Sequence, residues 1–237
     1  MPITNPLLSL RELKYGWRPD APPVLDIPEF DLAHGEKIFI TGPSGSGKST
    51  LLGIIAGVLT PQRGALRILE QNITRLSAAG RDRFRADHIG FVFQLFNLIP
   101  YLSVRDNVTL PCHFAAGRRA RIAGIGSTPE REALRLLNDL GLSDPALLAR
   151  PVTELSVGQQ QRVATARALI GSPPLLIADE PTSALDATHR QRFLELLFHE
   201  CAVQGTSLLF VSHDESLSPA FDRRLHMNEI NRVASRP

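Results

Sequence analysis

The stretch "KIFITGPSGSGKSTLLGIIAGVL", Lys37 to Leu59, gives the clearest indication of the fold. It begins with a short apolar run, Lys37–Thr41, typical of a buried strand, and ends in an apolar pattern typical of a helix. Three glycines between them let the backbone turn, so that successive N–H groups and the helix N-terminus can face a phosphate. A strand, a glycine-rich loop and a helix in this order predict a phosphate loop, Gly42–Ser49.

Two side chains give the phosphate loop its chemistry. Lys48 can reach β- and γ-phosphate oxygens, and the hydroxyl of Ser49 can ligate Mg²⁺. The sequence therefore predicts a site for a nucleoside triphosphate with Mg²⁺; the alternative is a glycine-rich turn with an incidental lysine. The residues expected to contact the nucleotide here are Gly42, Pro43, Ser44, Gly45, Ser46, Gly47, Lys48, Ser49 and Thr50.

Composition sets the class of protein. With 237 residues, 43% of them hydrophobic, the chain can bury a real core in one domain. The net charge of +2 gives no reason to expect a nucleic-acid partner, although the basic run Gly117–Arg121 predicts a loop with a local positive patch. No apolar run approaches the ~20 residues of a membrane-spanning helix, so a membrane role would depend on a partner.

Four short apolar runs predict the fold class. Their near-continuous hydrophobicity indicates strands covered on both faces, as in the parallel sheet of an α/β protein. We expect these strands within residues 37–41, 88–93, 174–179 and 207–212. Helical patterns separate them, among them 127–141, where Ser127 and Glu130 have capping-box spacing, and 189–205.

The run "LLIADE", Leu175 to Glu180, ends a predicted strand in two carboxylates. Side chains alternate along a strand, so the two acids can serve different roles. Asp179 is placed to hold Mg²⁺, and Glu180 to orient and polarise an attacking water. The alternative is a pair of solvated acids at a strand end.

Two further polar residues follow predicted strands. Gln94 comes after "HIGFVF" and can reach the metal or the attacking water at the hinge into the helical segment that follows. His213 comes after "SLLFVS" and can donate a hydrogen bond to a γ-phosphate. The alternatives are an exposed loop glutamine and a histidine without a role beside a helix cap.

A second candidate anion-binding site is "LSVGQQQR", Leu155 to Arg162. Ser156 and Gln159 have capping-box spacing, and the apolar positions from Val163 to Ile170 share one helical face. A serine hydroxyl, Gly158 and a helix N-terminus can receive a phosphate. The alternative is a well-capped helix with no ligand.

Taken together with "SALD" (183–186), these motifs have the order and approximate spacing of the ATP-binding-cassette ATPases, and the sequence resembles that family over essentially its whole length. The resemblance implies one ABC ATPase domain over 1–237. Its P-loop NTPase (RecA-like) core would comprise about 1–94 and 163–237, with a parallel sheet and an N-terminal antiparallel β edge. A helical subdomain would be inserted at about 95–162.

The resemblance also implies a working homodimer. ATP would lie between the phosphate loop of one subunit and the signature loop of the other, with Asp186 at the same interface. The signature residues acting in trans would be Ser156, Val157, Gly158 and Gln159. Glu180, His213 and Gln94 would be catalytic, and Ser49, Gln94 and Asp179 would hold Mg²⁺.

The aromatic that stacks on adenine in this family matches Trp17 first and Tyr15 second; the alternative for either is a packed aromatic. The signature departs from the usual LSGGQ at Val157, because a β-branched residue disfavours positive φ. This departure puts the Val157 N–H contact with the γ-phosphate in question.

Within the family, the sequence is most similar to the lipoprotein-releasing and macrolide-exporting group. That likeness implies an ATP hydrolase that powers a separate integral membrane permease, as a peripheral protein on the cytoplasmic face of the inner membrane. The residues that would receive the permease are Phe96, Leu98, Pro100, Tyr101 and Leu102; the alternative is that they belong to the core of the helical arm. The rival function is a soluble, non-transport cassette, for example in iron-sulfur cluster assembly.

Overall fold

The strands and helices of the computed structural model, which describes residues 5–18 and 21–233, fall into two units. The first comprises residues 1–85 and 207–237, and the second comprises residues 86–206. The predicted division into a core and a helical subdomain at about 95–162 is not tested by this partition and stays a prediction.

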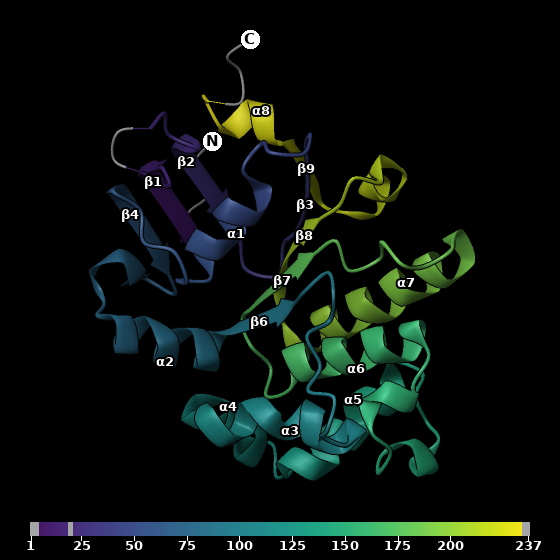
Figure 1. Ribbon diagram of the computed structural model, residues 1–237. Coiled ribbons are helices and arrows are strands. Elements are labelled where there is room, and N and C mark those ends of the chain that lie inside the picture. Colours follow the sequence, from purple (N-terminus) through teal and green to yellow (C-terminus); the bar gives the residue numbers. More distant parts are fainter. Residues whose placement is uncertain (1–4, 19–20, 234–237) are drawn as a thin grey trace. The chain divides into compact units, whose positions relative to one another are not determined.

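An antiparallel sheet forms part of the first unit, in the order β2-β1-β4-β5 (Figure 1). The expected antiparallel β edge near the N-terminus is therefore confirmed. Buried and more exposed positions alternate along β1 and β2, so each strand turns one face to the core. The strands are β1 (Leu8–Tyr15), β2 (Leu25–Leu32), β4 (Arg63–Ile68) and β5 (Gln71–Asn72).

Parallel strands complete the first unit, with β3 (Lys37–Thr41) between β8 (Ser207–Val211) and β9 (Arg223–His226). β3 and β8 coincide with two of the predicted apolar runs. β9 was not predicted, because "RRLH" is polar and pairs along the edge of β3. The helical elements are α1 (Lys48–Ile55), η1 (Ile73–Arg75), α2 (Ala78–His88), which crosses the division between the units, η4 (Glu215–Ala220) and α8 (Met227–Ile230).

In the second unit, β6 (Ile89–Val92) pairs in parallel with β7 (Leu175–Asp179), as the other two apolar runs predict. An α/β fold with parallel strands is therefore confirmed. The helices are α3 (Val104–Phe114), α4 (Ala116–Gly124), α5 (Pro129–Asp139), η2 (Pro145–Leu147), η3 (Val152–Glu154), α6 (Val157–Leu169) and α7 (Ala187–Gln204). Among the described residues, no helix is long and apolar enough to cross a membrane.

Two local predictions in this unit are wrong. The cap of α5 is Thr128, whose hydroxyl accepts from the Arg131 N–H at 3.3 Å, rather than Ser127. Pro129 fixes the first helical position, so the cap falls on the residue directly before it. The basic run is also not a loop with an exposed patch, because it lies in α4 and its Arg118 is buried.

Arg118 binds four backbone carbonyl groups. Its guanidinium donates to the carbonyl oxygens of Ala86 and Ile89, each at 2.7 Å, and of Ala168 at 3.0 Å and Ile170 at 2.7 Å. Burial lowers its pKa to about 10, still far above neutral pH, so the side chain stays charged. One cation thus satisfies carbonyl groups at the start of β6 and at the end of α6.

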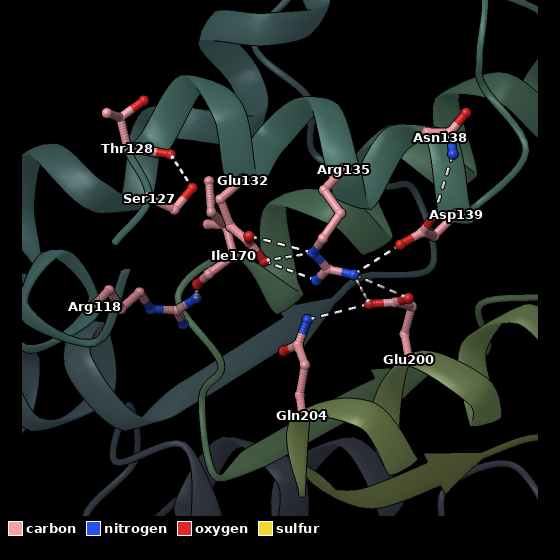
Figure 2. A network of polar contacts seen from close by, with 10 residues as sticks. All are labelled: Arg118, Ser127, Thr128, Glu132, Arg135, Asn138, Asp139, Ile170, Glu200 and Gln204. Carbon is pink, nitrogen blue, oxygen red and sulfur yellow. Dashed lines mark hydrogen bonds and ion pairs between the residues drawn. The ribbon is translucent and has the colours of Figure 1, made fainter. Parts of the chain in front are cut away.

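A second arginine, Arg135 of α5, lies among three carboxylates (Figure 2). It contacts Glu132 at 2.7 Å, Asp139 at 2.8 Å and the fully buried Glu200 of α7 at 3.1 Å. Burial acts to lower the pKa of Arg135, but its hydrogen bond to the carboxylate of Glu132 and the charge of Glu200 outweigh burial and raise the pKa. The cluster joins α5 to α7.

We expect Arg118→Met to destabilise the protein by about 3 kcal/mol, because four buried carbonyl groups lose a charged donor that an aliphatic side chain cannot replace. Urea denaturation measures the change. The matched control is Arg119→Met on the same helix, an exposed residue whose side chain donates to a single carbonyl group, that of Cys112, and it should cost less than about 1 kcal/mol. Equal stability of the two variants would contradict the role of Arg118.

Candidate functional site

The phosphate loop, Gly42–Ser49, ends in a helix N-terminus that is open to an anion. Gly47 is the N-cap of α1 with φ 96°, and among the described residues no side chain caps this helix. A Cβ atom on Gly47 would lie 2.6 Å from Cδ2 of Leu25, so both the backbone angle and the space require glycine. The first-turn N–H groups of α1 are therefore left for a ligand.

The polar atoms of the loop fit a phosphate. Nζ of Lys48, which is 7% exposed, donates to the carbonyl oxygens of Gly42 at 2.7 Å and Pro43 at 3.0 Å. Oγ of Ser46 is buried and has no hydrogen-bond partner among the residues that the structure describes. A cation, a buried hydroxyl and an uncapped helix start suit a polyphosphate. Ser49 is exposed at the same helix start.

The two candidate aromatics differ in exposure. Tyr15 is 8% exposed at the end of β1, whereas Trp17 is 64% exposed; their rings meet edge to face with centroids 5.3 Å apart. Trp17 therefore has a free ring face to offer, and Tyr15 supports it from within the unit.

Gln62 holds the backbone next to Trp17. Its Oε1 accepts from the Gly16 N–H at 2.9 Å, and its Nε2 donates to the Gly16 carbonyl at 2.6 Å. The carboxamide thus pairs with Gly16 as a neighbouring strand would. This contact could not be predicted from the sequence, since it joins residues 46 positions apart.

Gln94 lies exposed in the turn that follows β6. The next residues are strained, with φ 60° at Phe96 and 49° at Asn97. Arg167 of α6 holds this shape by donating to the carbonyl oxygens of Phe96 at 2.6 Å and Asn97 at 2.7 Å. Burial lowers the pKa of Arg167.

The segment after Gln94 is held by a second side chain, that of the buried Asn107 in α3. Its Oδ1 accepts from the Ile99 N–H at 2.8 Å, and its Nδ2 donates to the Ile99 carbonyl at 3.0 Å. Within the segment, Phe96 is buried and Tyr101 is 83% exposed. The set proposed to receive a permease therefore divides: Phe96 belongs to the core, Leu98 and Leu102 are half-buried, and Pro100 and Tyr101 face outward.

The signature segment, Leu155–Gln159, begins α6 with the expected capping box. The Gln159 N–H donates to Oγ of Ser156 at 3.3 Å, and the Ser156 N–H donates to Oε1 of Gln159 at 2.9 Å. Val157 is the first residue of the helix and has helical backbone angles. The positive φ that made valine doubtful here is not required, so the N–H groups of Val157 and Gly158 keep their place in the first turn.

The acidic strand end carries backbone strain. Asp179 closes β7, and the half-buried Glu180 follows with φ 49°, an uncommon angle for a residue other than glycine. The next residue, Pro181, accepts a hydrogen bond at 2.8 Å from Nε2 of the buried Gln161 in α6. The signature helix is thus tied directly to the residue after Glu180.

Asp186 caps α7. It accepts from the His189 N–H at 2.9 Å and lies 2.7 Å from Nδ1 of the same residue, and these hydrogen bonds hold the pKa of Asp186 below its usual range. His213 is exposed two residues after the end of β8, and the next residue, Asp214, caps η4.

The candidate residues are divided between the units. The first unit carries the phosphate loop, Thr50, Tyr15, Trp17 and His213, and the second carries Gln94, the signature segment, Asp179, Glu180 and Asp186. The positioning side chains of Gln62, Asn107, Gln161 and Arg167 were not anticipated from the sequence, because each acts on backbone groups distant along the chain.

Comparison with known proteins gives a consistent family. A profile described as "ABC transporter" matches residues 25–183. The lipoprotein-releasing system ATP-binding protein LolD 2 of Rhodospirillum rubrum is 38% identical over 237 residues, covering 99% of each chain. LolD of Porphyromonas gingivalis is 39% identical over 195 residues, covering 82% of this chain and 85% of that protein.

Solved structures agree. A dimeric post-hydrolysis state of the ATP-binding cassette MJ0796, bound to ADP and Pi, matches with a TM-score of 0.80 and 34% identity, covering 92% of this chain and 93% of that one. A second dimeric structure of MJ0796, described as a bacterial ABC transporter cassette, gives a TM-score of 0.79 with the same coverage.

Trp17 is the only tryptophan of the chain, so fluorescence reports on it alone. We expect Gln62→Ala to lower its steady-state fluorescence anisotropy, because Gly16 loses both hydrogen bonds that fix the adjacent backbone. The control is Gln71→Ala, an exposed glutamine of β5 in the same unit, which should leave the anisotropy unchanged. An unchanged value for Gln62→Ala would contradict the contact.

Proposed function

The chain belongs to the ABC transporter family of ATPases, and we propose that it powers a separate membrane permease of the lipoprotein-releasing type. The observation that carries this proposal is the likeness to LolD 2 of Rhodospirillum rubrum, which covers 99% of the chain at 38% identity. The permease would carry out export, lipoprotein release or mechanotransmission. In this proposal the protein is peripheral on the cytoplasmic face of the inner membrane.

Nucleotide binding is proposed to begin at the phosphate loop. The uncapped first turn of α1, the buried Ser46 hydroxyl and Lys48 would bind the phosphates, and Gly42–Thr50 would enclose them. Trp17, exposed and supported by Tyr15, would stack on adenine.

Mg²⁺, when bound, would neutralise phosphate charge and help orient the β- and γ-phosphates. The hydroxyl of Ser49 and the carboxylate of Asp179 offer the hard oxygen ligands that this ion prefers, and the amide oxygen of Gln94 adds a third. The exposure of Ser49 at the start of α1 and of Gln94 after β6 supports these assignments.

Glu180 is proposed as the general base that orients the attacking water. Its strained φ of 49° supports this role, because such strain persists only where the surrounding structure over-determines it. His213 would donate a hydrogen bond to the γ-phosphate. Lys48 would stabilise the charge that develops on the transferred group.

A second copy of the chain is proposed to complete the site. The Ser156 hydroxyl and the N–H groups of Val157 and Gly158 would bind the γ-phosphate held by the other subunit, with Gln159 closing the capping box and Asp186 at the interface. The dimeric MJ0796 structures support this arrangement. ATP binding would join two subunits, and hydrolysis would release them.

The permease is expected to contact the segment around Tyr101. When the tagged protein is purified from detergent-solubilised membranes, an integral membrane protein should be recovered with it. Tyr101→Arg should reduce that recovery, because a charge replaces an 83% exposed aromatic. Val203→Arg, at a 60% exposed position of α7, is the matched control and should not. Recovery of a soluble scaffold or of RNA instead would refute the permease proposal and favour the non-transport alternative.

Glu180→Gln should bind ATP, hydrolyse it at least about 100-fold more slowly, and accumulate as a dimer, because the amide cannot accept a proton from water. Phosphate release and size-exclusion chromatography with ATP measure both effects. Glu195→Gln, an exposed carboxylate on α7, should retain the parental rate. If Glu180→Gln also hydrolysed ATP at that rate, another residue would be the general base.

A further inference from the structure

Asn231 directly follows α8 and is 1% exposed. Its Nδ2 donates to the carbonyl oxygens of Val24 at 3.0 Å and Ser46 at 3.2 Å. Its Oδ1 accepts from the N–H groups of Asp26 at 2.9 Å and Val233 at 3.3 Å. A carboxamide offers two donor hydrogens and two acceptor lone pairs, so the hydrogen-bonding capacity of this side chain is fully used.

The contact with Ser46 acts on the phosphate loop itself. In a trans peptide the C=O and the following N–H point in opposite directions. Holding the Ser46 carbonyl toward Asn231 therefore turns the Gly47 N–H away from it. Gly47 is the N-cap of α1, and Leu25 and Val24 lie against its Cα. The orientation of this peptide plane is thus fixed by Asn231 on one side and by the start of β2 on the other.

A second residue of the same segment supports the other end of the loop. Met227 is fully buried, and a Cβ atom on Gly42 would lie 3.0 Å from its Cβ. Gly42 also offers the carbonyl that Lys48 binds. Met227 and Asn231 bracket α8, so one short helix lies against both ends of the phosphate loop.

The segment from Met227 to Asn231, which we call the brace, is attached to both sheets of the unit. β9 leads into α8 and pairs in parallel with β3, the strand that enters the phosphate loop. The Arg232 N–H donates to the Asp26 carbonyl at 2.9 Å, beside the bond from Asp26 to Asn231. The segment that carries Asn231 is therefore attached to β2 and β3 as well as to the phosphate loop.

We propose that Asn231 is a positioning residue for phosphate binding, which sets the peptide between Ser46 and Gly47 so that the loop is formed before the nucleotide arrives. This rests on the proposed function only in taking Gly42–Ser49 as the phosphate-binding loop, and it does not depend on the permease. A preformed loop spends less binding free energy on ordering its own backbone. Loss of the brace should weaken affinity for any polyphosphate, whatever base it carries.

The test is isothermal titration of the full chain with MgATP and, separately, with inorganic tripolyphosphate. Asn231→Asp keeps the acceptor for Asp26 but sets an oxygen against two carbonyl groups. It should weaken both ligands by about tenfold, the effect of losing one or two ordinary hydrogen bonds. Trp17→Ala should weaken MgATP while leaving tripolyphosphate unchanged, which separates the phosphate side of the site from the base.

Asn231→Ser, a smaller change, serves if the aspartate variant does not fold. In this variant hydrogen exchange of the backbone amides of 45–48 should be faster than in the parent, while exchange in β8 is unchanged. Ile68→Val, at a buried position of β4, is the control for a general loss of stability and should alter neither affinity.

Parental affinity for both ligands in Asn231→Ser, with unchanged exchange of 45–48, would overturn the inference and leave Asn231 a purely structural residue. If the parent chain itself bound neither ligand, the proposed function would fail first.

Discussion

Backbone carbonyl groups at the ends of helices and strands, and in the turns that follow them, are the constraint on which the rest of this structure depends. Removing such a group from water without a partner costs free energy, so each needs a donor. Arg118 donates hydrogen bonds to four of these groups. Arg167 donates to the carbonyl oxygens of Phe96 and Asn97, and Asn107 donates to that of Ile99. The two arginines reach carbonyl groups far along the chain, and the asparagine binds a turn close to its own helix. The segments that carry candidate functional residues can therefore leave regular geometry and still be fixed.

The two helix starts of the candidate site meet the same need in opposite ways. At α1, no side chain among the described residues caps the helix, so the first-turn N–H groups remain for phosphate. At α6, Ser156 and Gln159 cap each other. A serine cap accepts from the backbone and keeps its own proton to donate. An aspartate, such as the one that caps α7, would do the first but add a negative charge that repels phosphate. A serine at position 156 therefore suits this site in two ways: it caps α6, and it adds no negative charge.

Local pattern was enough to predict the parallel strands β3, β6, β7 and β8, the phosphate loop and the Ser156–Gln159 capping box, because their signals lie within a few residues. What it missed depends on contacts distant along the chain. Arg118 appears as a surface charge until β6 and the end of α6 bring carbonyl groups around it. Val157 was doubted for a positive φ that its place in α6 does not demand. The polar strand β9 forms only because β3 has an open edge.

The hydrogen bond from Gln161 to Pro181 gives the second unit a mechanical property. Gln161 lies one turn into α6, beyond the signature segment, and its side chain is buried with no room to follow a moving partner. Pro181 comes directly after Glu180, whose φ of 49° already lies in a narrow allowed region. A displacement of α6 along its axis must either break the 2.8 Å bond or move the Pro181 carbonyl. Proline fixes its own φ, so that movement is divided between the ψ of Pro181 and the backbone angles of Glu180. The signature helix and the backbone directly after the glutamate are therefore linked by one hydrogen bond.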